Sequence, residues 1–197
     1  MPFYDRSLDM IVATAQAPQT IGGLTDVLSR YGVPSIIRSA ARSGAPQAQA
    51  FTTAVSAAEA HGTRLFIAQC GVIVDLGGGA KVEIFFPDRD ASAMPAEDGC
   101  PMFKLMFGKT SFFFSCGTPA IETYVTTLDG SKLSSDVLLT TGDEPEIFAG
   151  FVSPQYAIFP CASNASSSVF VKLQIQVEST CNRTMTFISD GSSVQLQ

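Results

Sequence analysis

Short apolar runs alternate with helical segments along the first part of the chain. Residues 10–14 and 35–37 are largely apolar and short, which is typical of buried strands. Between them, four apolar residues recur at helical spacing and Gly32 ends the segment. These four residues are Leu24, Val27, Leu28 and Tyr31. The pattern predicts a strand–helix–strand unit at this end of the chain.

A loop of small and polar residues is expected at 39–50, followed by a helix from about 47 to 60 that ends at His61 and Gly62. The middle of the chain is predicted to be rich in strands, with turns of glycines at 77–79 and at Gly108. A loop is expected at 87–101. The predicted strands cover 65–68, 72–76, 82–86, 102–107 and 111–114.

The last third begins with a predicted helix after Thr118 and Pro119, which ends at Asp129 and Gly130. Further strands are expected at 137–140, 156–159 and 185–188. Residues 169–177 alternate between apolar and polar with a period of two, which predicts another strand.

The composition indicates one globular domain over residues 1–197, since 46% of the residues are hydrophobic. The formal net charge is −6, and the twelve basic residues form no run, so the chain carries no signal of a nucleic-acid surface. No apolar run is long enough to cross a bilayer, and we expect neither a membrane segment nor a signal peptide.

Five cysteines form an odd set without any Cys-x-x-Cys pair. This pattern argues against a structural zinc site and against a complete disulfide framework. We therefore expect buried free thiols. The cysteines are Cys70, Cys100, Cys116, Cys161 and Cys181.

A series of motifs in order carries a family resemblance. The opening 2–9 leads into the strand at 10–14 and then into the Ile-Gly-Gly-Leu sequence at 21–24. Later matches are 85–90, 108–112, 128–131, 135–138, 152–157 and 187–191. This frame resembles the metallo-β-lactamase-like domain of ComEC-type competence proteins. The resemblance implies an α+β fold, an αββα sandwich, whose first sheet is incomplete because the family's initial strands are missing here.

The resemblance also implies where metal ligands would stand. The family's first histidine and aspartate cluster corresponds to Ala15, Ala17, Gln19 and Thr20. Its metal-bridging aspartate corresponds to Gly117, and two further histidines correspond to Gly142 and Asp143. The last histidine loop is replaced by residues 162–168. We therefore predict no catalytic residue, no metal ligand and no cofactor.

Other chemistry has weaker support. Asp143, Glu144 and Glu146 could bind a hard cation such as magnesium, although solvated acids in a loop are the favoured interpretation. A nucleophile at Ser115 or Cys116 would need His61, the single histidine, as its base. The Gly-Lys-Thr sequence at 108–110 lacks the upstream glycine of a phosphate loop and is favoured as a hairpin turn.

The favoured function is a non-catalytic structural or interaction module. By resemblance it would be extracytoplasmic and linked to DNA uptake, and a protein partner or a second copy would cover the open edge of the first sheet. The rival hypothesis is a metal-dependent phosphodiesterase or nuclease with atypical ligands.

Overall fold

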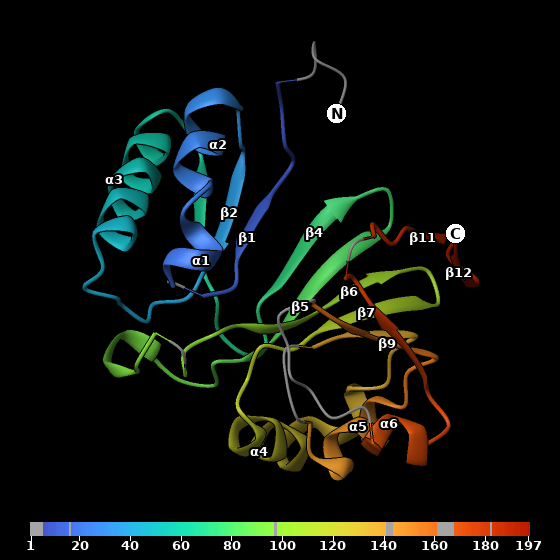
Figure 1. The fold of residues 1–197 in the computed structure, drawn as a ribbon. Helices are drawn as coiled ribbons and strands as arrows, with labels where there is room; N and C mark the ends of the chain where they lie inside the picture. Colours follow the sequence, from blue (N-terminus) through green and yellow to red (C-terminus); the bar gives the residue numbers. More distant parts are fainter. Residues whose placement is uncertain (1–5, 16, 97, 141–143, 161–167, 182) are drawn as a thin grey trace. The chain divides into compact units, whose positions relative to one another are not determined.

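The computed structural model describes residues 6–15, 17–96, 98–140, 144–160, 168–181 and 183–197 (Figure 1). Its contacts divide the chain into two compact units. Unit 1 combines Met1–Gln69 with Pro87–Pro101, and unit 2 combines Cys70–Phe86 with Met102–Gln197. Each unit is described by itself below, and the single domain over 1–197 stays a prediction.

Unit 1 contains a parallel sheet in the order β1-β2-β3, in which Ile36 of β2 lies opposite Ile11 of β1 and Leu65 of β3. Helices α1, α2 and α3 pack together beside this sheet (Figure 1). Short 3-10 helix η1 (Ala91–Ala93) lies in the predicted loop 87–101. The other elements are β1 (Ile11–Ala13), α1 (Pro18–Ile21), α2 (Leu24–Arg30), β2 (Ser35–Arg38), α3 (Pro46–Ala60) and β3 (Arg64–Ile67).

The core of unit 1 forms where the helices meet the sheet. Phe51 and Val55 are one helical turn apart on α3, and both are buried against Ile36 of β2. Ile21 of α1 is also fully buried in this core. The sequence pattern misses α1 because a four-residue helix is too short to show helical periodicity.

Unit 2 contains a seven-stranded sheet in the order β10-β9-β8-β7-β6-β5-β4. Strands β4 to β7 are antiparallel neighbours, whereas β7 to β10 pair in parallel. The strands are β4 (Ile73–Gly77), β5 (Ala80–Phe86), β6 (Met102–Phe107), β7 (Thr110–Phe114), β8 (Val137–Leu139), β9 (Tyr156–Phe159) and β10 (Gln176–Ser179).

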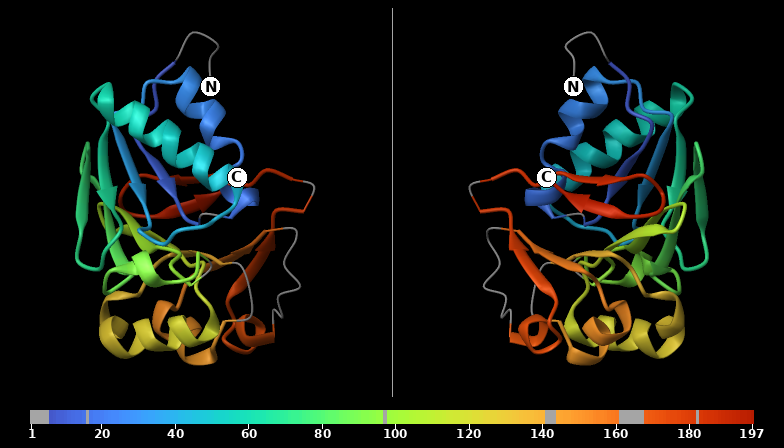
Figure 2. Two further views of the ribbon diagram at one scale, coloured as in Figure 1. Left: turned by 90° about the vertical axis from the view of Figure 1, so that its left-hand side faces the viewer. Right: turned by 90° about the vertical axis from the view of Figure 1, so that its right-hand side faces the viewer.

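Three helices lie together along this sheet (Figure 2). Phe113 of β7 and Phe148 of α5 are both fully buried, and their rings meet edge to face at 5.9 Å. This contact identifies the face of the sheet that bears Phe113 as its helix side. The helices are α4 (Pro119–Asp129), α5 (Glu146–Val152) and α6 (Ser168–Lys172), with 3-10 helix η2 (Gly130–Lys132) after α4.

A separate hairpin, β11 (Phe187–Ser189) with β12 (Val194–Leu196), ends unit 2. Its turn touches the β6–β7 turn, where the backbone N–H of Lys109 donates to the Gly191 carbonyl at 2.7 Å. A Cβ at Gly108 would lie 2.3 Å from that carbonyl oxygen, so the position requires glycine. The hairpin turn predicted at 108–110 is confirmed.

The strand predicted over 169–177 is wrong. Residues 168–172 form α6, and β10 begins only at Gln176. Phe170 is fully buried and packs against Phe159 of β9 at 5.4 Å, while Val171 is 67% exposed. The alternation in the sequence therefore does not separate a buried face from an exposed one, and a single aromatic anchor decides the conformation.

The predicted α+β class is confirmed, as are most predicted elements to within a few residues. Besides α1, the elements that were not anticipated are α5, β12 and the two short 3-10 helices η1 and η2. Among the described residues, no helix is both long and apolar enough to cross a membrane.

Candidate functional site

The carboxyl end of β1 leads into the first set of predicted ligand positions in unit 1. Ala15 and Ala17 present only methyl groups there. Thr20 of α1 donates its hydroxyl to the carbonyl oxygens of Ala15 at 2.8 Å and Ala17 at 2.9 Å. Gln19 also lies in α1, but its side chain falls outside the described part of the structure. This loop is held by its own hydrogen bonds and offers no imidazole or carboxylate at positions 15, 17 and 20.

Gly22 completes this turn. Its backbone N–H donates to the Pro18 carbonyl at 3.0 Å, and a Cβ would lie 2.8 Å from that oxygen. Glycine therefore lets the chain pass from α1 to α2 without a clash. The backbone between Pro18 and Gly22 is thus closed by a hydrogen bond.

The carboxyl end of β7 carries Ser115, Cys116 and Gly117 in unit 2. A Cβ at Gly117 would lie 3.2 Å from both Ile121 Cγ2 and Met102 Sδ, so the position is already crowded. Gly117 has no side chain to replace the bridging carboxylate. Gly142, Asp143 and most of the loop 162–168 lie outside the described residues.

Four polar side chains are buried near the carboxyl ends of β7 and β8. We call them the buried polar cluster. Ser115 is 3% exposed and donates its hydroxyl to Glu122 Oε1 of α4 at 2.5 Å. The cluster consists of Ser115, Glu122, Thr140 and Glu144. Glu122 is 2% exposed, Thr140 1% and Glu144 5%. Polar groups so far from solvent are costly unless they are paired.

Burial raises the pKa of Glu122 to about 8. The hydrogen bond from Ser115 opposes this shift, and the nearby charge of Glu144 adds to it. The carboxyl group of Glu122 is therefore mostly protonated at neutral pH. Sequence analysis misses Glu122 because the apolar side predicted for its helix does not include it, and an exposed position is the usual expectation for a glutamate.

The acidic cluster suggested by the sequence at 143–146 does not stay together. Glu146 is exposed and pairs with Lys172 Nζ of α6 at 2.6 Å. Glu144 is buried and acts electrostatically on Glu122. Asp143 lies outside the described residues. The acids that act on each other in the structure are therefore Glu144 and Glu122, which lie 22 positions apart in the chain, and not the neighbours at 143–146.

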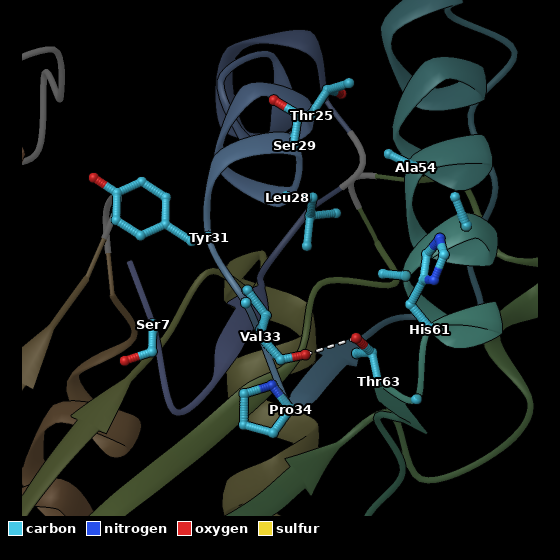
Figure 3. A pocket seen from close by; sticks show the side chains of 14 residues that line it. Ser7, Thr25, Leu28, Ser29, Tyr31, Val33, Pro34, Ala54, His61 and Thr63 are labelled. Atoms are coloured by element: carbon cyan, nitrogen blue, oxygen red, sulfur yellow. Dashed lines mark hydrogen bonds between the residues drawn. The ribbon is translucent and has the colours of Figure 1, made fainter. Parts of the chain in front are cut away.

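His61 lies at the C-terminal end of α3, as predicted, and lines a pocket of about 680 Å3 in unit 1 (Figure 3). β3 begins three residues later, so His61 stands at the amino edge of the parallel sheet. The predicted ligand positions follow the carboxyl end of β1, which is the opposite edge. His61 therefore does not supply an imidazole to them.

Among the described residues that line the pocket there is no Asp, Glu, Lys or Arg. Its walls come from α2, α3 and the segments before β2 and β3, where the Thr63 hydroxyl donates to the Val33 carbonyl at 2.7 Å (Figure 3). Sites in open parallel sheets usually lie at the carboxyl edge. The labelled polar side chains around it are Ser7, Thr25, Ser29, Tyr31, His61 and Thr63.

The expectation of buried free thiols is wrong for three cysteines. Cys100, Cys116 and Cys181 are disulfide-bonded, and Cys161 lies outside the described residues. Cys70 keeps its thiol, which lies 3.8 Å from Asp129 Oδ2 as a hydrogen-bond donor. Pairing depends on the approach of Cβ atoms in space, which sequence spacing does not reveal. Cys116 in a disulfide offers no thiolate nucleophile, and the Ser115 hydroxyl is bound to Glu122.

Within the described residues, no three side chains of His, Cys, Asp or Glu are grouped so that they could hold a metal ion. That the chain has no catalytic residue and no metal ligand stays a prediction, because several of the relevant positions lie outside those residues.

No family model and no curated protein sequence matches this chain. The solved structures that share its fold include the following two. One is Igni18, a metallo hydrolase from the archaeon Ignicoccus hospitalis, with 10% identity and a TM-score of 0.54 over 96% of this chain and 79% of that protein. The other is the metallo-β-lactamase fold protein YhfI from Bacillus subtilis, with 9% identity and a TM-score of 0.51 over 88% of this chain and 75% of that protein. The chain has the metallo-β-lactamase fold.

Proposed function

We propose that this chain is a non-catalytic structural or interaction module built on the metallo-β-lactamase fold. The observation that carries the proposal concerns the loop after β1. There the Thr20 hydroxyl donates to two backbone carbonyls, and the side chains of Ala15 and Ala17 have no atom that could bind a metal. Metal-dependent hydrolysis needs imidazoles and carboxylates that converge on a cation and activate a water. Gly117 removes a further donor position at the end of β7.

Metal analysis and turnover test this proposal together. The protein is purified from cells grown with zinc and manganese, and its metal content is measured. Single-stranded DNA and a phosphodiester are then tested as substrates. We expect substoichiometric transition metal and no turnover. Stoichiometric metal together with turnover would establish the rival hydrolase.

A control separates true turnover from a contaminant. Glu144→Gln removes a buried carboxylate, whereas Glu146→Gln removes an exposed one of the same loop region. Turnover that belongs to this chain through atypical carboxylate ligands would fall in the first variant and persist in the second. Turnover by a contaminating enzyme would be the same in both variants as in the wild type.

We further propose that a protein partner or a second copy adds a strand to β1. Among the described residues β1 pairs with β2 alone, although Ile11 and Ala13 are buried. An open edge of a parallel sheet favours strand addition. Light scattering after size exclusion measures self-association, and hydrogen exchange at residues 11–13 tests whether the edge becomes protected with increasing concentration or with an added partner.

An extracytoplasmic location is the third part of the proposal. Disulfides persist in oxidising compartments, and three cysteines of this chain are disulfide-bonded. A link with DNA uptake rests on the resemblance to ComEC-type domains, and the net charge of −6 favours contact through a protein rather than directly with phosphates. To test this, protein from native cells is alkylated before reduction and then analysed by peptide mapping. We expect Cys70 to be alkylated and Cys100, Cys116 and Cys181 to be unmodified.

A further inference from the structure

The three helices of unit 2 carry large apolar side chains on their exposed sides. We propose that these side chains form the contact surface between two copies of the chain. The inference concerns unit 2 alone and is independent of the strand addition proposed for β1 in unit 1. We call the surface the outer helix patch, and among the described residues it consists of Tyr124 and Leu128 of α4, Ile147 and Phe151 of α5, and Val171 of α6.

Helix α5 is apolar on both of its sides. After Glu146 its sequence contains only apolar residues and one glycine. Phe148 and Val152 are fully buried, whereas Ile147 is 51% exposed and Phe151 is 47% exposed on the other side of the helix. A surface helix normally has a polar outer face, and a helix that is apolar all round is normally covered all round. The exposed side of α5 is therefore the surface that association would shield from water.

The exposed side of α5 continues onto α4. A Cβ at Gly130 would lie 2.9 Å from the ring carbons Cδ1 and Cε1 of Phe151, so this ring rests on the backbone directly after α4. Leu128 precedes Gly130 by two residues, and Tyr124 lies one helical turn before Leu128 on the same side. The exposed apolar residues thus form one surface over two helices, and contiguous apolar surface of this kind marks interaction sites.

A depression of about 550 Å3 lies beside α5 at this surface. Its walls include Ile147, Phe151 and Leu173, and Gly150 lies among them without a side chain. A Cβ at Gly150 would have no atom within 4 Å, so the space above this residue is open. A protruding apolar side chain of a partner can fill such a hole, as in the knobs-into-holes packing of helices. Apolar anchors in recesses of this kind contribute most of the binding free energy in protein interfaces.

The charges beside the outer helix patch favour a second copy as its partner. Glu146 of α5 pairs with Lys172 of α6 at 2.6 Å, and Asp129 of α4 pairs with Lys132 at 2.8 Å. Each pair is neutral as a whole, so two copies can bring these surfaces together without net repulsion there, although the chain carries a net charge of −6. In a two-fold dimer the same patch serves both copies, and an apolar centre with few charges is typical of homodimer interfaces.

A lipid surface matches the patch less well. Helices that lie on membranes combine an apolar face with many Lys and Arg residues, which attract anionic headgroups. Here Lys132 and Lys172 are each paired with an acid, and the net charge of the chain is negative. We therefore expect the chain not to bind lipid vesicles.

Analytical ultracentrifugation of the whole chain over a series of concentrations measures the association. We expect a monomer–dimer equilibrium with a Kd on the order of 10 µM, since a patch on three short helices makes a small interface. The dimer should persist at high salt, because burial of apolar surface and not charge attraction stabilises it. A chain that is monomeric even at about 1 mM would overturn the proposal. Flotation of the monomer with neutral or anionic lipid vesicles would also overturn it, by assigning the patch to a membrane surface.

Two variants change the patch without loss of a buried contact. Gly150→Lys places a long charged side chain over the depression, where its Cβ meets no atom and where Glu146 lies one helical turn earlier as a favourable partner. Ile147→Asp adds an acid to the first turn of α5, which the helix dipole favours. Each variant should raise the dimer Kd by about 100-fold or more, because a substitution occurs twice in a two-fold interface. Circular dichroism and thermal unfolding of the dilute monomers should match the wild type.

Ile188→Asp is the matched control. Ile188 of β11 is 48% exposed, much like Ile147, but lies outside the outer helix patch. Its substitution should leave the dimer Kd unchanged. A dimer that survives both Gly150→Lys and Ile147→Asp would form through another surface, such as the edge of β1, and would overturn the proposal.

Discussion

The loop after β1 and the buried polar cluster both lie at strand ends, but they differ in which polar groups they contain and in how deeply these are buried. After β1, small neutral residues replace the expected ligands, and Thr20 forms hydrogen bonds to Ala15 and Ala17. At the ends of β7 and β8, the chain buries two carboxylates and two hydroxyls instead. The hydroxyl of the first region is exposed to water, whereas the second region holds the buried carboxyl group of Glu122, which is mostly protonated at neutral pH.

Burial explains why the difference matters. Thr20 is exposed, so water can compensate for any imperfect contact. The members of the buried polar cluster are shielded from water, and a low local dielectric strengthens each satisfied interaction and each unsatisfied one alike. Substitutions in the cluster should therefore have larger and more pH-dependent effects than substitutions in the loop.

The largest effect is expected for Glu122→Gln. The folded-state pKa of Glu122 is raised from 4.5 to about 8, so the stability contributed by the protonated form is present below pH 4.5 and is lost as pH rises towards 8. This group should lower the free energy of unfolding of the wild type by up to about 1.4 kcal/mol per pH unit in that window. The variant should lack this slope. Urea denaturation at several pH values measures the difference, and parallel profiles for both proteins would contradict it.

Ser115→Ala should have a smaller effect, costing about 1–2 kcal/mol through the lost hydrogen bond to buried Glu122. Because that hydrogen bond lowers the pKa of Glu122, its removal should raise this pKa further and extend the pH-dependent slope to higher pH. Denaturation at pH 5 and at pH 8 to 9 separates the two consequences. An unchanged profile would show that the hydroxyl is not coupled to the acid.

Thr20→Val should cost about 0.5–1 kcal/mol, because the two carbonyl oxygens lose the one hydroxyl proton that they share and are solvated by water instead. The cost should be the same at pH 5 and pH 8. Thr53→Val on the exposed face of α3 is the matched control, with a change within about 0.5 kcal/mol. A pH-dependent cost for Thr20→Val would remove the contrast between the two regions.

Glu146→Gln should have the smallest effect. The ion pair with Lys172 is exposed on both sides, so its loss should cost less than about 0.5 kcal/mol and vanish at high salt. Denaturation with and without 1 M NaCl measures this. A loss comparable with that of Ser115→Ala would mean that this end of α5 is not the exposed control assumed above.

Much of the fold follows from local patterns. The runs at 10–14 and 102–107, the helix ending at His61 and the hairpin at Gly108 are each specified by residues close together in the chain. Local patterns fail at 169–177, where burial of Phe170 overrides an apparent alternation. They also fail at α1, whose four residues are held mainly by packing of Ile21 in the core.

The sequence by itself determined what is missing from the expected ligand positions, because an alanine or a glycine has no donor atom in any conformation. Only the tertiary structure decided which polar groups meet. Glu122 and Glu144 are separated in sequence, and neither helix periodicity nor composition shows that strand register brings Ser115 and Thr140 to the same face beside them. The same holds for the disulfide-bonded cysteines, since proximity in space is a property of the folded chain and not of residue spacing.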